Sequence, residues 1–208
     1  MELKIIQAEL FGQNIYVYHD GVTAVIIDPG DNFDGVKNFV AEKNLKVKAI
    51  LLTHGHFDHI YRANEVRELF GAPVYAHSNE AKLLQRADWN RSEYRGLDIT
   101  VAADNFFKDG DIFEISDSAR FSVIHTPGHT GGGVCYYDRE NAVIFTGDTL
   151  FRETIGRTDM PTGDHETLLS SIRNKLFSLP DDVKVYPGHE GSTTIAHEKK
   201  NNSRADLS

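Results

Sequence analysis

Three histidines and an aspartate lie close together in THGHFDHI, residues 53–60, and this cluster constrains the chain more than any other feature. The apolar run before it, residues 47–52, is typical of a buried β-strand. On an extended segment His54 and His56 point the same way, whereas Asp58 and His59 follow at the turn. Burying three imidazoles and a carboxylate costs free energy unless each finds a partner, and one metal ion can be the partner of several of them. We therefore predict a metal site, against the alternative of a solvated histidine-rich turn.

Three more predicted strands end in a glycine-containing turn followed by a possible ligand. These are residues 121–126 before His129, residues 142–146 before Asp148, and residues 183–186 before His189. Carboxyl ends of strands are where open α/β architectures place their sites. One cation cannot use seven ligands, but two can. The predicted arrangement gives the first cation His54, His56 and His129, gives the second Asp58, His59 and His189, and lets Asp148 bridge them.

The order of the predicted elements indicates an α/β protein. Residues 3–28 read as three antiparallel strands, and later strands alternate with single amphipathic helices. We expect two sheets with helices outside, in one domain spanning residues 1–208. Residues 79–96 look helical and a surface loop or lid follows up to residue 110. The polar end of the chain, residues 197–208, is expected to be frayed.

Composition excludes several classes of function. The formal net charge of −9 argues against binding to nucleic acid or an anionic membrane, since both need clustered Lys and Arg. No apolar run approaches the ~20 residues that span a bilayer, and we find no signal peptide at the start of the sequence. Cys135 is the single cysteine, so it has no disulfide partner within the chain, and a cytoplasmic location is expected. We interpret this thiol as an inert core residue.

The chain resembles the metallo-β-lactamase superfamily, whose motifs are H-x-H-x-D-H followed by a His, a bridging Asp and a final His. Within it the chain looks most like the short bacterial glyoxalase II-like hydrolases of the hydroxyacylglutathione hydrolase type. The stretches that carry this resemblance are TPGHTGGG at 126–133, FTGDTLF at 145–151, IGRTDMPTGDHETLLSSI at 155–172 and VYPGHE at 185–190. The resemblance implies an αββα sandwich, with two mixed β-sheets and helices on the outer faces, and a dinuclear site along one edge.

A dinuclear site of this type implies hydrolysis. Two divalent cations acidify a shared water, and the resulting bridging hydroxide attacks a carbonyl. Zinc is the expected metal, with iron and manganese as alternatives. Thioesters such as S-D-lactoylglutathione suit this chemistry because their thiol leaves readily. Asp58 and Asp148 are the carboxylates that we assign to catalysis.

Substrate contacts are less marked in the sequence. Arg152 and Arg157 follow the bridging aspartate and are candidates to bind an anionic, glutathione-linked thioester, unless they pair with nearby acidic residues instead. Trp89 and Tyr94 are candidates to cover the site, or else to pack in a helix. Asp28 either orients a histidine ligand or only completes an Asp-Pro-Gly turn. Longer glyoxalase II enzymes use a C-terminal helical domain to hold glutathione, and nothing like it follows His189, so we expect weak glutathione binding.

Three other functions remain open. Glutathione persulfide dioxygenases, which use a single iron, also resemble the chain and share a GRTD stretch like residues 156–159, although they continue differently where this chain has Met160. A lactonase, a β-lactamase or another ester hydrolase is the second alternative. A metal-binding module without catalysis is the third.

Overall fold

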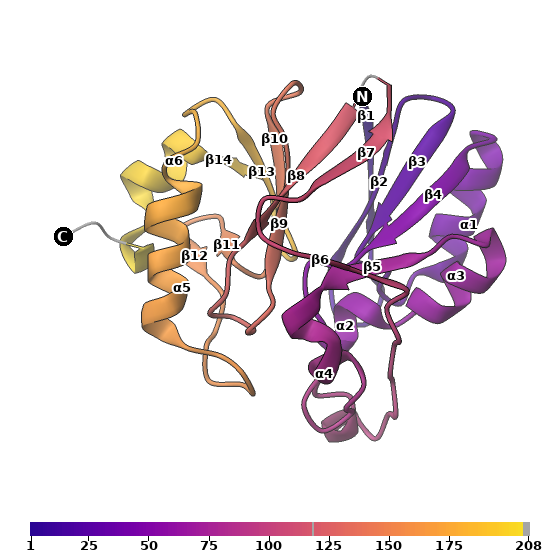
Figure 1. Cartoon of the computed structure of the whole chain (residues 1–208), viewed down its shortest axis with the longest axis horizontal. Helices are drawn as coiled ribbons and strands as arrows, with labels where there is room; N and C mark the ends of the chain where they lie inside the picture. The colour runs from indigo at the N-terminus through magenta and orange to yellow at the C-terminus, as the bar shows by residue number, and fades with distance from the viewer. Residues whose placement is uncertain (118, 206–208) are drawn as a thin grey trace.

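The computed structural model describes residues 1–117 and 119–205, whose main strands form two six-stranded sheets packed face to face (Figure 1). The first sheet has the order β1 (Glu2–Gln7), β2 (Asn14–His19), β3 (Thr23–Ile27), β4 (Lys46–Leu51), β5 (Val74–His77) and β6 (Asn105–Phe107). Strands β1 to β3 are antiparallel, as predicted, and β3 to β6 are parallel. Helices α1 (Phe33–Glu42) and α3 (Ala63–Phe70) cover its outer face.

The second sheet has the order β14 (Thr193–Thr194), β13 (Lys184–Pro187), β10 (Val143–Gly147), β9 (Val134–Asp138), β8 (Ala119–His125) and β7 (Ile112–Ser116). Only β13 and β10 pair in parallel among these described strands. Helix α5 (His165–Ser171), which continues as a π-helical turn over Ile172–Leu176, and α6 (Ile195–Asn201) lie on the outer face. A small hairpin of β11 (Leu150–Phe151) and β12 (Thr154–Ile155) follows β10.

Alternation along the strands explains the layers. In β2, Ile15 and Val17 pack toward the helices, whereas Tyr16 and Tyr18 pack toward the other sheet. In the second sheet Tyr136 faces the first sheet, and Cys135 faces the helices. Both sheets therefore bury both faces, and the αββα sandwich implied by the resemblance is confirmed.

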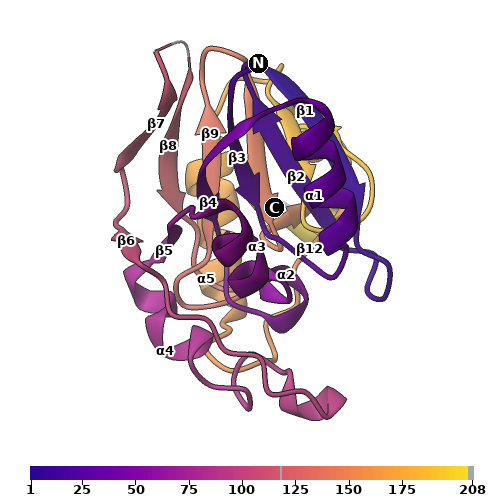
Figure 2. The same cartoon turned by 90° about the vertical axis from the view of Figure 1, so that its right-hand side faces the viewer.

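The connections nearest the sheet edge contain short helices. Helix α2 (Phe57–Ile60) begins inside the histidine cluster, and β5 continues into a 3₁₀ turn (Ser78–Glu80) and α4 (Ala81–Leu84). Residues 85–104, which we call the 85–104 segment, then lead to β6 and contain one 3₁₀ turn, Glu93–Arg95. Figure 2 shows this segment projecting below α4.

The structure corrects two expectations from the sequence. Strand β6 lies within the stretch expected to be a loop, where it adds to the edge of the first sheet beside β5. The tail is ordered as α6 and a 3₁₀ turn (Ser203–Ala205), because Thr194 caps the helix and Ile195 and Ala205 are buried against the second sheet. The expected fraying at residues 206–208 lies outside the described residues. No helix in residues 1–117 and 119–205 is long and apolar enough to cross a bilayer.

Candidate metal centre

The seven predicted ligands come together at one edge of the sandwich. Each follows the carboxyl end of a strand, as expected, and strands β4, β8, β10 and β13 supply them in turn. The first group is entirely histidine: the ligand atoms of His54, His56 and His129 lie within 4.8 Å of one another. In the second group, the ligand atoms of Asp58, His59 and His189 also lie within 4.8 Å of one another.

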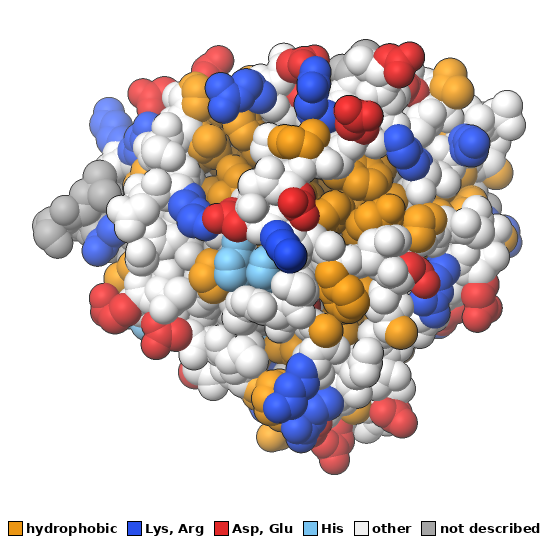
Figure 3. All heavy atoms as spheres, in the orientation of Figure 1, with side chains coloured by type: hydrophobic (Ala, Val, Ile, Leu, Met, Phe, Trp, Pro, Cys, Tyr) orange, Lys and Arg blue, Asp and Glu red, His pale blue; other side chains and the backbone are white. Residues whose placement is uncertain are grey.

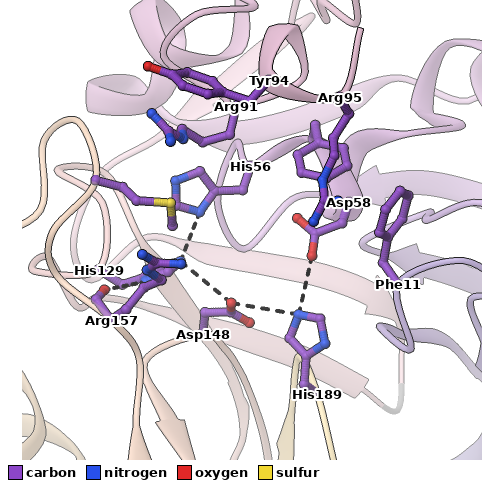
Figure 4. A pocket seen from close by; sticks show the side chains of 12 residues that line it. Phe11, His56, Asp58, Arg91, Tyr94, Arg95, His129, Asp148, Arg157 and His189 are labelled. Atoms are coloured by element: carbon purple, nitrogen blue, oxygen red, sulfur yellow. Dashed lines mark hydrogen bonds and ion pairs between the residues drawn. The ribbon is translucent and has the colours of Figure 1, made fainter. Parts of the chain in front are cut away.

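Asp148 lies between the two groups (Figure 4). Its Oδ2 is 3.5 Å from His129 Nε2 in the first group and 3.8 Å from His189 Nε2 in the second. Its Oδ1 is 3.2 Å from His59 Nε2. The position between both groups is the one expected of a bridging carboxylate.

The donor atoms suit a divalent cation. Burial lowers the pKa of His54 well below its usual value and that of His56 to about 3, so both rings are neutral and keep a free lone pair. The Nε2 atoms of both rings are buried and have no hydrogen-bond partner among the described residues. Orphaned imidazole nitrogens beside carboxylates fit metal ligands, and the mixed nitrogen and oxygen set suits zinc, iron or manganese alike.

Hydrogen bonds behind the histidines fix which nitrogen faces the site. His59 Nδ1 donates to Asp28 Oδ2 at 2.9 Å, and Asp28 also accepts from the Thr53 amide and hydroxyl at 2.7 and 2.6 Å. His129 Nδ1 donates to the Arg157 carbonyl at 2.7 Å. Asp28 holds these contacts at a φ of +50°, a strained angle for a residue other than glycine. Of its two interpretations, the structure therefore favours the orienting role.

The turn that carries His189 is held by the opposite sheet. The backbone N–H of Asn14 in β2 donates to Gly188 O at 2.7 Å, and its side chain donates to Pro187 O at 3.1 Å. Gly188 leaves no room for a side chain, since a Cβ there would lie 2.2 Å from Asp148 Oδ1. This contact between sheets was not predicted from the sequence.

Glu80 links the two loops that carry the first group. It is 1% exposed, and its Oε1 accepts from Thr130 Oγ1 at 2.5 Å and from the Gly132 amide at 2.7 Å, while Oε2 accepts from the Gly55 amide at 3.1 Å. Burial raises the pKa of this carboxyl, and the three hydrogen bonds counter that effect. Sequence analysis missed Glu80, because it belongs to no motif and its partners are distant in the chain.

A cavity of about 460 Å³ opens above the ligands. Its floor contains His56, Asp58, His129, Asp148 and His189. Its walls are mainly aromatic and cationic, and include Phe11, Arg91, Tyr94, Arg95, Arg157 and Met160. The walls thus bring positive charge to a site in an acidic protein.

The candidate substrate residues divide between this cavity and other places. Tyr94 and Arg157 line the cavity, although the Arg157 guanidinium also donates to both oxygens of Asp159 at 2.7 Å. Trp89 does not cover the site but packs under the Lys82 and Arg86 side chains. Cys135 is fully buried and free, and burial raises its pKa to about 12.

The structure does not place Arg152 in the cavity beside the predicted ligands. Arg152 and Glu153 form the tip of the hairpin between β11 and β12, and Arg152 lines a separate shallow pocket with Lys184 and His197. The tight turn carries Arg152 away from the cavity, even though it follows Asp148 closely in sequence. Arg91 and Arg95 line the cavity instead, and a cluster of arginines in an acidic chain was the only signal for them.

Sequence comparisons agree with this geometry. The model of the metallo-β-lactamase superfamily matches residues 8–189. A probable metallo-hydrolase of Streptococcus pyogenes is 42% identical over 92% of this chain and 84% of its own length. The hydroxyacylglutathione hydrolase GloC of Haemophilus influenzae is 38% identical over 97% of both chains.

Solved structures are similar over nearly the whole chain. The B3 metallo-β-lactamase BLEG-1 has a TM-score of 0.92 and 42% identity, covering 97% of this chain and 98% of its own. TTHA1623 in a di-iron-bound form has a TM-score of 0.87 and 34% identity, covering 96% of this chain and 98% of its own. ETHE1 from Myxococcus xanthus has a TM-score of 0.84 and 31% identity, covering 99% of this chain and 84% of its own. The matched family model and these relatives show that the chain, which has four layers and its predicted ligands at the strand ends, belongs to the metallo-β-lactamase superfamily.

Proposed function

We propose that this metallo-hydrolase cleaves thioesters of the S-D-lactoylglutathione type with two divalent cations, of which zinc is the first choice. The observation that carries the proposal is the position of Asp148 between two three-ligand groups, on the floor of an arginine-lined cavity. The similarity to GloC, a hydroxyacylglutathione hydrolase, supports the same substrate class. The partner we propose is therefore a small thioester.

The reaction adds water across the acyl–sulfur bond. Bound cations would supply an acidified water and a polarised carbonyl. His54, His56 and His129 would hold one cation through neutral imidazoles, and Asp58, His59 and His189 would hold the other. Asp58 and Asp148 would add carboxylate oxygens to the ligand set, and both lie on the floor of the cavity where substrate would bind. The acyl carbon gains the water oxygen and loses its bond to sulfur, so the products are a carboxylate and a thiolate and the two water protons pass to the solvent. The thiol's pKa near 8.5 makes a separate acid for the leaving group unnecessary.

Two alternatives have support of their own. ETHE1 from Myxococcus xanthus is 31% identical in sequence, and the chain carries GRTD at residues 156–159, so oxidation of glutathione persulfide at one iron is the second candidate. BLEG-1, a B3 metallo-β-lactamase, is 42% identical, so a β-lactam or lactone substrate is the third.

Metal analysis and a substrate panel on one preparation separate these functions. After reconstitution with zinc, manganese or iron, we expect about two cations per chain and release of thiol from S-D-lactoylglutathione. One iron per chain with oxygen uptake on glutathione persulfide, and no thioester cleavage, would replace the proposal by the dioxygenase. Equal rates on a lactone, a β-lactam and the thioester would mean a broad hydrolase without a thioester site.

A further inference from the structure

One wall of the cavity is built by the 85–104 segment and is firmly anchored. Asn90 and Ser92 are fully buried within it. The Asn90 carbonyl accepts from the amide of Phe57, the first residue of α2, at 3.0 Å, and the Asn90 side chain donates to Ile99 O at 2.6 Å. The segment is therefore tied directly to the loop that carries the first four ligands.

Arg91 is held in an unusual conformation between these two anchors. Its φ is +75°, in the left-handed region that disfavours residues other than glycine. Its guanidinium lies 3.6 Å from the centre of the Tyr94 ring, and Arg95 lies 5.8 Å from the centre of the Phe11 ring. Figure 4 shows these four side chains around the mouth of the cavity. Strain that neighbouring contacts maintain is common at binding sites.

The two arginines keep their charge available. Arg157 on the other wall is neutralised by Asp159, with which it forms two hydrogen bonds. In contrast, neither Arg91 nor Arg95 forms an ion pair within residues 1–117 and 119–205; the pKa of Asp159 is lowered first by its hydrogen bond to Arg157, and the charge of Arg91 contributes to it from a longer distance. Lys and Arg side chains also gather at the lower tip of the molecule in Figure 3, where Figure 1 places the 85–104 segment. A cationic rim in a chain of net charge −9 favours an anionic ligand.

We propose that Arg91 and Arg95 form a carboxylate-binding subsite for the thiol half of the substrate, with Tyr94 and Phe11 as its apolar walls. Guanidinium groups bind carboxylates through paired hydrogen bonds, and aromatic rings hold them in place. The subsite selects thioesters whose thiol carries carboxylates at some distance from sulfur, as glutathione does. The inference rests on the proposed function, since it concerns the same cavity.

Two thioesters with the same acyl group test the subsite. S-D-lactoylglutathione carries carboxylates on its thiol half, and the lactoyl thioester of N-acetylcysteamine carries none. We expect Arg91→Ala and Arg95→Ala each to raise KM for the glutathione thioester about three- to fivefold, and the double variant about tenfold or more, with little change in kcat. KM for the uncharged thioester should not change. Arg152→Ala is the matched control, because it removes an exposed arginine outside the cavity.

A binding measurement keeps the subsite distinct from the proposed reaction. Calorimetric titration of the zinc-loaded wild-type protein with glutathione should show binding that weakens with salt, and the double variant should lose about tenfold in affinity. Equal KM effects on both thioesters, or unchanged glutathione binding in the double variant, would overturn the subsite. If the wild-type protein binds glutathione through these arginines but cleaves neither thioester, the proposed function fails and the subsite stands.

Discussion

Replacing Glu80 by glutamine tests whether the site depends on the link between its two ligand loops. The carboxylate accepts three hydrogen bonds, two at Oε1 and one at Oε2. An amide has one acceptor atom and one donor atom. Whichever way the glutamine amide is turned, its NH₂ group faces a backbone N–H, of Gly55 or of Gly132, and that buried donor loses its partner.

The cost follows from this lost partner. Leaving one buried N–H unsatisfied costs about 1–3 kcal/mol, which in a protein of this size lowers Tm by roughly 2–12 °C. Gly55 separates His54 from His56, and Thr130 follows His129, so loosening their backbone also displaces ligands. Losing such support commonly costs about 10–100-fold in metal affinity, and we expect the lower end because Glu80 contacts no ligand side chain.

Thermal unfolding of the metal-free protein and competition with a chromophoric chelator measure the two effects separately. Thr130→Val, which removes one donor and leaves both backbone bonds, should give a smaller loss of stability. Glu65→Gln is the matched control, because Glu65 is 43% exposed and its pairing with Arg62 at the surface contributes less than about 1 kcal/mol. Unchanged Tm and unchanged metal affinity in Glu80→Gln would show that Glu80 does not hold the loops together.

Three other outcomes are expected. Asp148→Asn should lower kcat/KM at least about a hundredfold and reduce the metal content, since a neutral amide bridges cations poorly; full activity with two cations retained would contradict the bridging role. Cys135→Ala should keep turnover within a few fold of the wild type, because the thiol is fully buried, and a loss of activity at normal metal content would show that the thiol takes part. Removing both cations with a chelator should lower Tm by about 11–22 °C relative to protein held at a hundredfold excess of free metal over Kd, because each cation that binds only the folded state adds about 2.7 kcal/mol; no shift in a calorimetric scan would argue against a preformed site.

The candidate ligands, which the structure brings together, could be picked out in the sequence because their signals are local. Each follows an apolar strand and a turn, and four of them lie within one short stretch. Glu80 and Asn14 could not, because their partners lie far away in the sequence and only the packed sheets bring them together. For Arg152 the reason is the opposite. Its closeness to Asp148 in sequence suggested that it lies beside the ligands, but the turn between β11 and β12 directs it away from the cavity. The order of residues 197–205 was not predicted, because these residues are mostly polar; Ala205 and the preceding Ile195 supply core contacts that hold them.

The division of the ligands between the sheets has a consequence for assembly. The first sheet uses only residues 2–107 and the second only residues 112–194, so each half is continuous in sequence. Four ligands belong to the first half and three to the second. High-affinity cation binding should therefore occur only when the two halves are packed together. The hydrogen bonds from Asn14 in the first half to the turn before His189 in the second half form in the same packed state. A chain cut at residues 108–111 gives two fragments, each with part of the predicted ligand set. Divalent cations should stabilise their complex, so the affinity between the fragments should rise with metal concentration.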